Sequence, residues 1–324
     1  MPRLAQSDLL HLALQAVRDC GWTPIIVESA KPFLIRACNG DGAWLDLRVY
    51  IWNCTHGGKN RAPDEFRIQF TSTVPTTDPN AATLLMGWHD EKGVFAAWDI
   101  AAHEGQASSS PSAQIKEWTL AAASEKAFAV QRKDNEIVVA FRPAFLMDYA
   151  LARASLHKTG AAEADNALLN ELPDLTDKEI DAIADRERRK IVRTITTRFR
   201  ARTFRGRVLT AYGHRCAFCS VQLSLLDAAH IVPVAAPGST DEIVNGVALC
   251  KLHHFAYDEN LVSFDASYAI EVSAARLGEL SGRHGGLPGF RSALGGSLAL
   301  PAQERHYPKP EYIRSSRKVR GWRD

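Results

Sequence analysis

The stretch YGHRCAFCSVQLSLLDAAHIVPVAAPGSTDEIVNGVALCKLHHFAYDENLVSFD, residues 212–265, says most about the fold of the C-terminal part of the chain. It contains the pair Cys216-x-x-Cys219 and, further along, the pair Cys250-x-x-His253. Two such pairs supply four ligands, the set typical of a structural zinc ion. Because four protein ligands leave no open coordination position, we predict that this zinc is structural and not catalytic.

Other polar side chains of the same stretch lie outside the zinc set. His230 lies in a strand-like run, Asn245 precedes Gly246 in a loop, and His254 begins a predicted helix that also carries Asp258. Positions 254 and 258 are i and i+4, so their side chains can share one helix face. An imidazole beside a carboxylate is a suitable open site for Mg²⁺ or another cation that prefers oxygen ligands.

The stretch resembles an HNH endonuclease, and in particular the HNH domains of modification-dependent restriction enzymes. Besides the zinc pairs, the matching pieces are Tyr212–Cys216, Leu226–Pro233, Asn245–Cys250 and Leu252–His254. The resemblance extends over about residues 190–310. It implies the ββα-metal fold and hydrolysis of DNA phosphodiester bonds with one catalytic divalent ion, which is Mg²⁺, Mn²⁺ or Ni²⁺.

The resemblance also implies a role for each matching polar residue. His230 is the general base, which takes a proton from water for in-line attack on the scissile phosphate, and a neutral imidazole suits this role. Asn245 orients His230 or the loop around it. His254 holds the divalent ion, which stabilises the phosphorane and the leaving 3′ oxygen.

One position departs from the family pattern. Many HNH nucleases carry an Asp directly before the first His as a second metal ligand, but here this residue is Ala229. We expect Asp227, three residues before His230, to face away from the ion. Asp258 is therefore the predicted second ligand, and the alternative for Asp258 is a structural cap or hydrogen bond.

The net charge conceals a segregation along the chain. Lys and Arg total 39 against 37 Asp and Glu, and the resulting +2 taken alone argues against a strongly basic nucleic-acid binder. The chain is nevertheless acidic over residues 160–185, and basic over residues 186–207 and 305–324. The near-neutral total is thus an acidic segment cancelling two basic segments that flank the nuclease motifs.

A long helix is predicted over residues 177–212, opened by a capping box of Thr176 and Glu179. Its basic part is either a solvated helix that supports a core or a helix that faces phosphates. In the second case the DNA-binding residues are the arginines of this part: Arg193, Arg198, Arg200, Arg202, Arg205 and Arg207.

The fold class predicted for the whole chain is α+β. Apolar spacing near 3.6 predicts a helix over residues 7–21, and short apolar runs between turn residues predict strands. Helices are also expected over residues 114–124 and 143–157. Together they predict a mixed, mainly antiparallel N-terminal α+β domain, followed by the long helix and a zinc-stapled ββα-metal domain. The predicted domains are a DNA- or modification-recognition domain (1–157), an acidic linker with the start of the long helix (158–185), and the nuclease domain with its basic tail (186–324).

The N-terminal domain is the expected source of selectivity, because one HNH site reads mostly the DNA backbone. A reader of an extruded base needs aromatic faces for stacking and polar edges for hydrogen bonds. The candidate recognition pocket consists of Trp52, His56, Arg67, Gln69, Trp88 and Trp98. The alternative is that the tryptophans fill a core and that the alternating polar residues form a solvated face.

Composition narrows the class of protein further. No apolar run reaches the roughly 18 residues of a membrane helix, and the N-terminus lacks the apolar core of a signal peptide. We therefore expect a cytoplasmic protein without a membrane partner, in which the six cysteines are thiols or metal ligands and not disulfides.

The predicted function is a metal-dependent endonuclease of double-stranded DNA, a restriction or defence enzyme that responds to modified DNA. A double-strand break needs two sites, so a homodimer is expected. Two alternatives remain open: a zinc-stapled nucleic-acid-binding module without cleavage, and a defence nuclease that a small molecule or partner protein triggers through the N-terminal domain.

Overall fold

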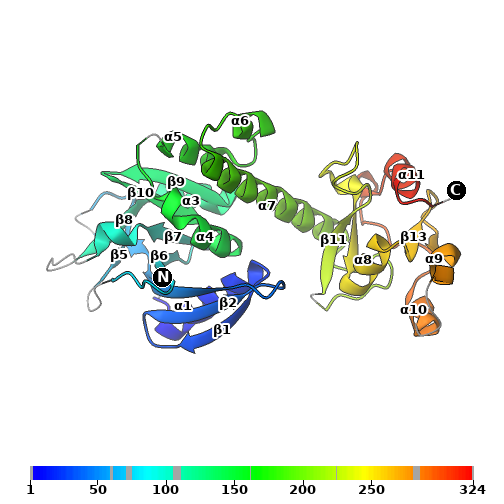
Figure 1. Ribbon diagram of the computed structural model, residues 1–324, viewed down its shortest axis with the longest axis horizontal. Coiled ribbons are helices and arrows are strands. Elements are labelled where there is room, and N and C mark those ends of the chain that lie inside the picture. Colours follow the sequence, from blue (N-terminus) through cyan, green and yellow to red (C-terminus); the bar gives the residue numbers. More distant parts are fainter. Residues whose placement is uncertain are drawn as a thin grey trace. The chain divides into compact units, whose positions relative to one another are not determined.

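The computed structural model describes residues 3–58, 61–70, 75–104, 111–160, 162–223, 225–279 and 285–322. The chain divides into two compact units, Met1–Phe199 and Arg200–Asp324, which are described separately below. The boundary falls inside helix α7 (Arg186–Ala211), drawn in green in Figure 1. Within the described part of the chain, no helix is both long and apolar enough to cross a membrane.

The first unit is built on a seven-stranded sheet with the strand order β1-β2-β3-β6-β7-β10-β9. Only β3 and β6 pair in parallel, and the other neighbours are antiparallel, which confirms the mixed, mainly antiparallel sheet. The strands are β1 (Thr23–Glu28), β2 (Phe33–Cys38), β3 (Trp44–Asn53), β6 (Ala82–His89), β7 (Val94–Trp98), β9 (Phe128–Lys133) and β10 (Glu136–Phe141).

Both faces of this sheet are covered, as expected from central strands that are buried throughout. One face packs with α1 (Gln6–Asp19), α4 (Leu146–Leu156) and the first part of α7 into one apolar core. The other face packs with α3 (Glu117–Lys126) and a second, three-stranded sheet into another core. The strands of the second sheet, in the order β4-β5-β8, are β4 (Thr55–His56), β5 (Glu65–Gln69) and β8 (Ser112–Lys116).

The helix predicted over residues 114–124 is partly wrong. Residues Ser112–Lys116 form strand β8, which pairs antiparallel with β5, and the helix α3 begins only at Glu117. Alternate residues of β8 are buried, so the strand places Ala113 and Ile115 in the core. The other short elements of this unit are α2 (Ile100–His103) and the 3₁₀ turn η1 (Pro143–Phe145).

The predicted helix over residues 177–212 is two helices. Thr176 and Glu179 do form the predicted capping box, but the helix α6 that they open ends at Asp181. Helix α7 begins anew at Arg186, where the Asp185 carboxylate accepts a hydrogen bond from the backbone N–H of Arg188. The break lets Ile180 and Ile183 both reach the apolar core.

The segment before α6 is not a bare linker. It contains α5 (Ala162–Ala167) and η2 (Leu168–Glu171). Leu169, Leu172 and Leu175 are buried in the core of the first unit. The acidic side chains of this segment therefore lie on a peptide that packs against the sheet domain.

The second unit has a small core around a ββα arrangement. Strands β11 (Leu226–His230) and β12 (Gly246–Cys250) pair antiparallel, and α8 (Lys251–Asp258) follows β12 directly and contacts both strands. The remaining elements are η3 (Ile243–Asn245), β13 (Val262–Phe264), β14 (Ile270–Val272), α9 (Ala274–Glu279), α10 (Leu287–Ala293), η4 (Glu304–His306) and α11 (Pro310–Val319). The predicted α+β fold class is confirmed.

Candidate metal centres and nuclease site

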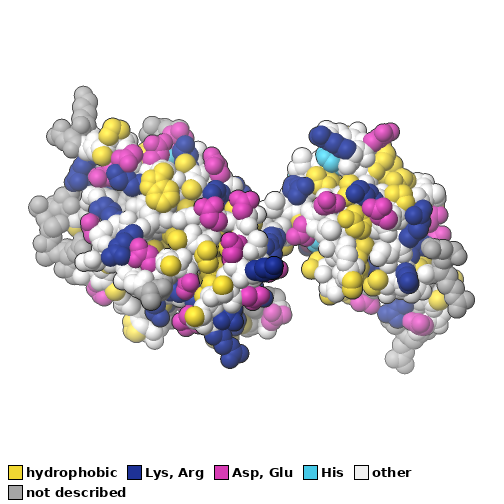
Figure 2. Space-filling model, turned by 90° about the horizontal axis from the view of Figure 1, so that it is seen from above, with side chains coloured by type: hydrophobic (Ala, Val, Ile, Leu, Met, Phe, Trp, Pro, Cys, Tyr) yellow, Lys and Arg dark blue, Asp and Glu magenta, His cyan; other side chains and the backbone are white. Residues whose placement is uncertain are grey.

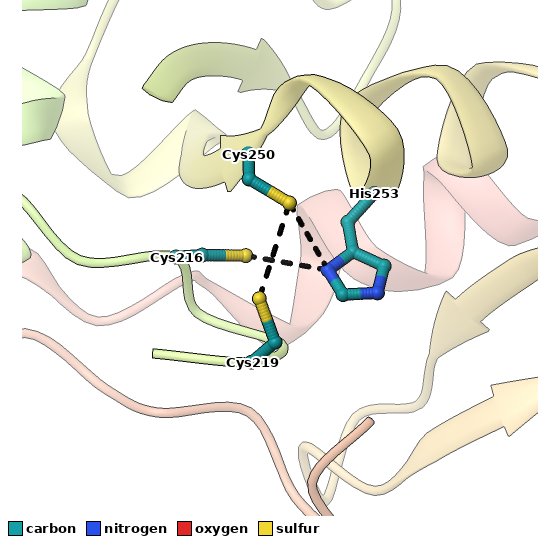
Figure 3. A group of neighbouring side chains, drawn as sticks. All are labelled: Cys216, Cys219, Cys250 and His253. Atoms are coloured by element: carbon teal, nitrogen blue, oxygen red, sulfur yellow. Dashed lines mark hydrogen bonds between the residues drawn. The ribbon is translucent and has the colours of Figure 1, made fainter. Parts of the chain in front are cut away.

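The four predicted zinc ligands converge in the second unit. Cys216 and Cys219 lie on a tight knuckle, Cys250 ends β12, and His253 lies in the first turn of α8 (Figure 3). The ligand atoms all lie within 4.8 Å of one another. The backbone N–H of Ala217 donates to the carbonyl of Ala248 over 2.7 Å, which fixes the knuckle against β12.

The spacing of these atoms fits a tetrahedral zinc ion. Zinc–sulfur and zinc–nitrogen bonds of normal length imply about 3.8 Å between two sulfurs and about 3.6 Å between sulfur and nitrogen. The Sγ atoms of Cys219 and Cys250 are 3.9 Å apart, and His253 Nδ1 lies 3.3 Å from Cys250 Sγ and 3.5 Å from Cys216 Sγ. All six cysteines of the chain are free of disulfide bonds. The cluster thus suggests a structural zinc site.

The pKa values of the three clustered cysteines also favour a bound cation. Burial raises the pKa of Cys219 to about 12 and also raises that of Cys250. Burial likewise raises the pKa of Cys216, but hydrogen bonds from His253 and from backbone amides outweigh it and bring the pKa to about 6. Thiolates are the ligand form of cysteine, so a bound divalent cation is what would stabilise three of them together here.

His230 is held by two neighbours. Its ring stacks on Phe204 with 3.8 Å between centroids and 13° between planes. Its Nε2 lies 2.9 Å from Oδ1 of Asp241, a residue that sequence reasoning missed. Because a carboxylate only accepts hydrogen bonds, Nε2 carries a proton, and in the neutral ring Nδ1 is then the nitrogen with the lone pair. Within the described residues, Nδ1 makes no hydrogen bond.

Asn245 is buried and joins the two ends of the loop that separates His230 from Asp241. Its Oδ1 accepts from the backbone N–H of Val232 over 2.9 Å, and its Nδ2 donates to the carbonyl of Thr240 over 2.8 Å. These two bonds bring Asp241 back toward the end of β11. The side chain therefore acts on the loop, and none of its hydrogen bonds within the described residues goes to the His230 ring.

His254 lies between two carboxylates, one at each ring nitrogen. Oδ2 of Asp258 is 3.3 Å from Nε2, and Oδ2 of Asp227 is 3.9 Å from Nδ1. The expectation that Asp227 faces away was wrong. Alternate residues of a strand share a face, so position 227 lies on the same side as Ala229, where HNH nucleases usually carry the ligand.

Two basic side chains meet at Asp227. Arg205 Nε lies 3.0 Å from Oδ1, and Lys251 Nζ lies 2.5 Å from Oδ2. Burial raises the pKa of Asp227, but the hydrogen bond from Lys251 and the charges of Lys251 and Arg205 outweigh it and hold the pKa below its usual value. Asp227 is therefore an ionised carboxylate surrounded by donors that could also hold a phosphate.

Comparison with known proteins identifies this unit. Residues 216–265 match the HNH endonuclease family. The C-terminal unit contains an HNH endonuclease domain. Membership of this family implies nuclease activity and a DNA substrate. The match covers the zinc ligands, both strands of the ββα arrangement and α8.

The N-terminal unit matches a different family. Residues 45–150 match the family described as Methylase-associated X1, from β3 into the first part of α4. A solved structure, the modification-dependent TagI restriction endonuclease, aligns over 84% of this chain and 80% of its own, with 12% identity and a TM-score of 0.29. No curated protein matches the chain.

The arginines predicted to contact DNA are not a free basic face. Arg193 pairs with Asp181, Arg198 NH1 lies 2.7 Å from Asp148 Oδ1, and Arg205 is engaged by Asp227. Arg200 and Arg202 also have partners, which leaves only Arg207 exposed without one within the described residues. On the face drawn in Figure 2, Lys and Arg side chains likewise alternate with Asp and Glu.

The structure does not bring all residues of the candidate recognition pocket together. Trp98 is 1% exposed, and its indole N–H donates to the Gln114 carbonyl, so it presents no ring face and its assignment to a pocket was wrong. The ammonium of Lys31 lies 3.4 Å from the centroid of the Trp52 ring. Arg67 and Gln69 lie on β5, half-buried, beside the strand β8.

Two of these residues do line one pocket of the Methylase-associated X1 region. His56 and Trp88 border a cavity of about 490 Å³ together with Phe66 and His89. The Nδ1 of His89 accepts from the backbone N–H of Lys92, so Nε2 carries the proton, and burial lowers the pKa of this imidazole. The pocket thus combines aromatic edges with a neutral hydrogen-bond donor.

Proposed function

We propose that this protein is a metal-dependent endonuclease that hydrolyses phosphodiester bonds of double-stranded DNA, and that it is a restriction enzyme acting on modified DNA. One observation carries the first part: a single strand of the HNH domain presents His230, paired with Asp241, and Asp227, which approaches His254. A general base that can deprotonate water and a carboxylate that can bind a cation thus lie on the same strand.

His230 is the proposed general base. Its free Nδ1 takes the proton of the attacking water, and its Nε2–H remains bonded to Asp241. The carboxylate of Asp241 then stabilises the imidazolium that forms, and the Phe204 ring keeps the imidazole in one plane. Asn245 contributes by holding the loop that carries Asp241.

His254 and Asp227 are the proposed ligands of the catalytic ion. When bound, a divalent ion supplies the positive charge that stabilises the pentacovalent phosphorane and the leaving oxygen. Lys251, beside Asp227, is 67% exposed and free to swing away from a cation. The predicted ligand Asp258 is instead paired with the buried guanidinium of Arg320. We therefore assign Asp258 to orienting His254 through Nε2.

Arg205 and Lys251 are the proposed phosphate-binding side chains. Both reach the Asp227 carboxylate, and each is exposed enough to redirect toward a DNA phosphate. Both side chains would be available for this purpose if Asp227 held a cation in their place. The proposal therefore places the DNA backbone across β11 and the start of α8.

The N-terminal unit is the proposed reader. Its pocket of about 490 Å³ has room for a base, and Phe66, His56 and His89 offer aromatic and polar edges. The match to the Methylase-associated X1 family supports a connection with DNA modification. Each chain holds one HNH site, so a homodimer is proposed for a double-strand break.

The test is cleavage of supercoiled plasmid by the purified full chain, with Mg²⁺, Mn²⁺ or Ni²⁺. The plasmid is offered unmodified, methylated, hydroxymethylated and phosphorothioated. We expect linear product that depends on the metal and on one modification. No cleavage under any condition contradicts the endonuclease, equal cleavage of all plasmids contradicts the reader, and pure nicking by a stable monomer contradicts the dimer.

A further inference from the structure

Helix α8 carries two large apolar side chains on its outer face. Leu252 is 59% exposed and Phe255 is 67% exposed. The helix is anchored from its other side by His253, Ala256 and Tyr257, which are buried. Residues 252 and 255 are i and i+3 in one helix, so their side chains are neighbours. Leu252 and Phe255, the α8 apolar patch, therefore stand together on the surface of the HNH unit.

The α8 apolar patch adjoins the proposed nuclease site. Lys251 precedes Phe255 by four residues, so the two side chains share a helix face. The Lys251 ammonium pairs with the Asp227 carboxylate, and the His254 ring approaches the same carboxylate. The phenyl ring of Phe255 thus stands beside the place proposed for the scissile phosphate.

The acidic side chains around the patch are paired with cations. Asp227 is engaged by two basic side chains. Asp258 pairs with Arg320, and Glu259 pairs with Arg276. A phosphate chain that approaches this face of α8 therefore meets no unpaired charge from these three carboxylates.

DNA offers the partners that such a patch needs. A phenyl group gains free energy when it leaves water, and the deoxyribose carbons and bases of DNA lie directly beside each phosphate. Proteins that bind nucleic acids combine cations that hold phosphates with apolar or aromatic side chains that contact sugars and bases. Lys251 and Phe255 present this combination on successive turns of one helix.

We propose that the α8 apolar patch is a DNA-contacting surface, where Phe255 packs against the deoxyribose and base next to the scissile phosphate and Leu252 extends the contact. This rests on the proposed function in one respect, the placement of the scissile phosphate at Asp227 and His254. The patch supplies a part of the DNA affinity that salt does not weaken, because burial of an apolar side chain releases no counterions.

A second copy of the chain is the competing occupant of the patch. A homodimer is proposed above, and an exposed apolar patch can also mark a contact between subunits. The two occupants differ in what the loss of the phenyl ring changes. A DNA contact lowers the affinity for DNA, whereas a subunit contact lowers the tendency of the chain to associate.

The test measures binding of the full chain to a short DNA duplex, unmodified and methylated, over a range of KCl concentrations. Ca²⁺ replaces Mg²⁺, so that binding is measured without hydrolysis. The variants are Phe255→Ala, Phe255→Leu and Lys251→Ala, with Trp118→Ala as the control. Trp118 is an aromatic residue on helix α3 of the other unit and is 52% exposed. Zinc content and thermal unfolding report the integrity of each variant, and sedimentation reports its oligomeric state.

We expect Phe255→Ala to weaken binding by about tenfold at every salt concentration, so that the slope of log K against log salt stays the same. Lys251→Ala should instead reduce the magnitude of this slope by about 0.9, the value for one phosphate contact. Phe255→Leu should recover part of the affinity, and Trp118→Ala should change neither quantity.

Three results would overturn the proposal: unchanged affinity in Phe255→Ala, an equal loss in Trp118→Ala, or a loss that disappears at high salt. A smaller oligomer in Phe255→Ala with unchanged DNA affinity per subunit would assign the patch to a second copy instead. Failure of the proposed function is a separate result. If the wild type cuts no DNA, the proposed endonuclease is wrong, while the salt titration still decides whether Phe255 contacts DNA.

Discussion

Nε2 of His230 donates to Oδ1 of Asp241 over 2.9 Å, and this bond leaves Nδ1 as the one basic nitrogen of the ring. An asparagine at position 241 offers an N–H as readily as a carbonyl, so it no longer fixes the tautomer. We expect Asp241→Asn to slow single-turnover DNA cleavage by about 100-fold, with DNA binding unchanged. The neighbouring Glu242→Gln is the control, and a wild-type rate for Asp241→Asn would remove Asp241 from the mechanism.

Gly246 allows α7 to pack against β12. A Cβ added there would lie 2.4 Å from Val208 Cγ2 and 2.9 Å from Phe204 Cζ, whereas a Cβ at Gly206 meets nothing within 4 Å. Gly246→Ala should lower the free energy of unfolding by about 1–3 kcal/mol. Gly206→Ala, in the middle of a helix, should raise it by about 0.5–1 kcal/mol. Chemical denaturation measures both changes. A change of the same sign in the two variants would contradict this packing.

The zinc cluster should be needed for the fold of the HNH domain and not for its chemistry. We expect one zinc ion per chain, retained when Mg²⁺ is in excess. Cys219→Ser should lose the zinc and the cooperative unfolding of the domain, because the remaining ligands cannot close the site. Metal analysis and calorimetry test this. A variant that keeps its unfolding transition without zinc would show that the cluster is dispensable.

Selectivity for modified DNA should depend on the N-terminal pocket. His56 borders the pocket and contacts the edge of Phe66, so His56→Ala should bring the ratio of cleavage rates on modified and unmodified plasmid toward one. The cleavage rate on the poorer substrate should stay the same. His11→Ala, an exposed histidine on α1, serves as the control. Equal ratios in both variants would place the reader elsewhere.

Local patterns predicted the parts of this molecule that local geometry determines. The zinc pairs were found because two ligands on a knuckle and two at a strand–helix junction are set by short spacings. The mainly antiparallel sheet followed from short apolar runs and turn residues. The break between α6 and α7 was missed, because the helix stops where Ile183 enters a core made by distant strands.

The residues of the candidate site also fall into two groups: those that local motifs identify, and those that only the packing of distant segments brings together. His230, Asn245 and His254 stand in recognisable motifs, but Asp241 lies in a loop without regular spacing and reaches His230 only because Asn245 ties that loop. Arg320 meets Asp258 only through the packing of α11 on α8. No spacing rule joins residues that far apart in the chain.

The most direct test of the central claim is the rate at which supercoiled plasmid is cut by the wild type and by His230→Ala, with Mg²⁺ or Mn²⁺. We predict that the wild type cuts and that His230→Ala is slower by about 10²–10⁴-fold, with zinc content and DNA affinity unchanged. Cleavage by His230→Ala at the wild-type rate would contradict the assignment of His230 as the general base.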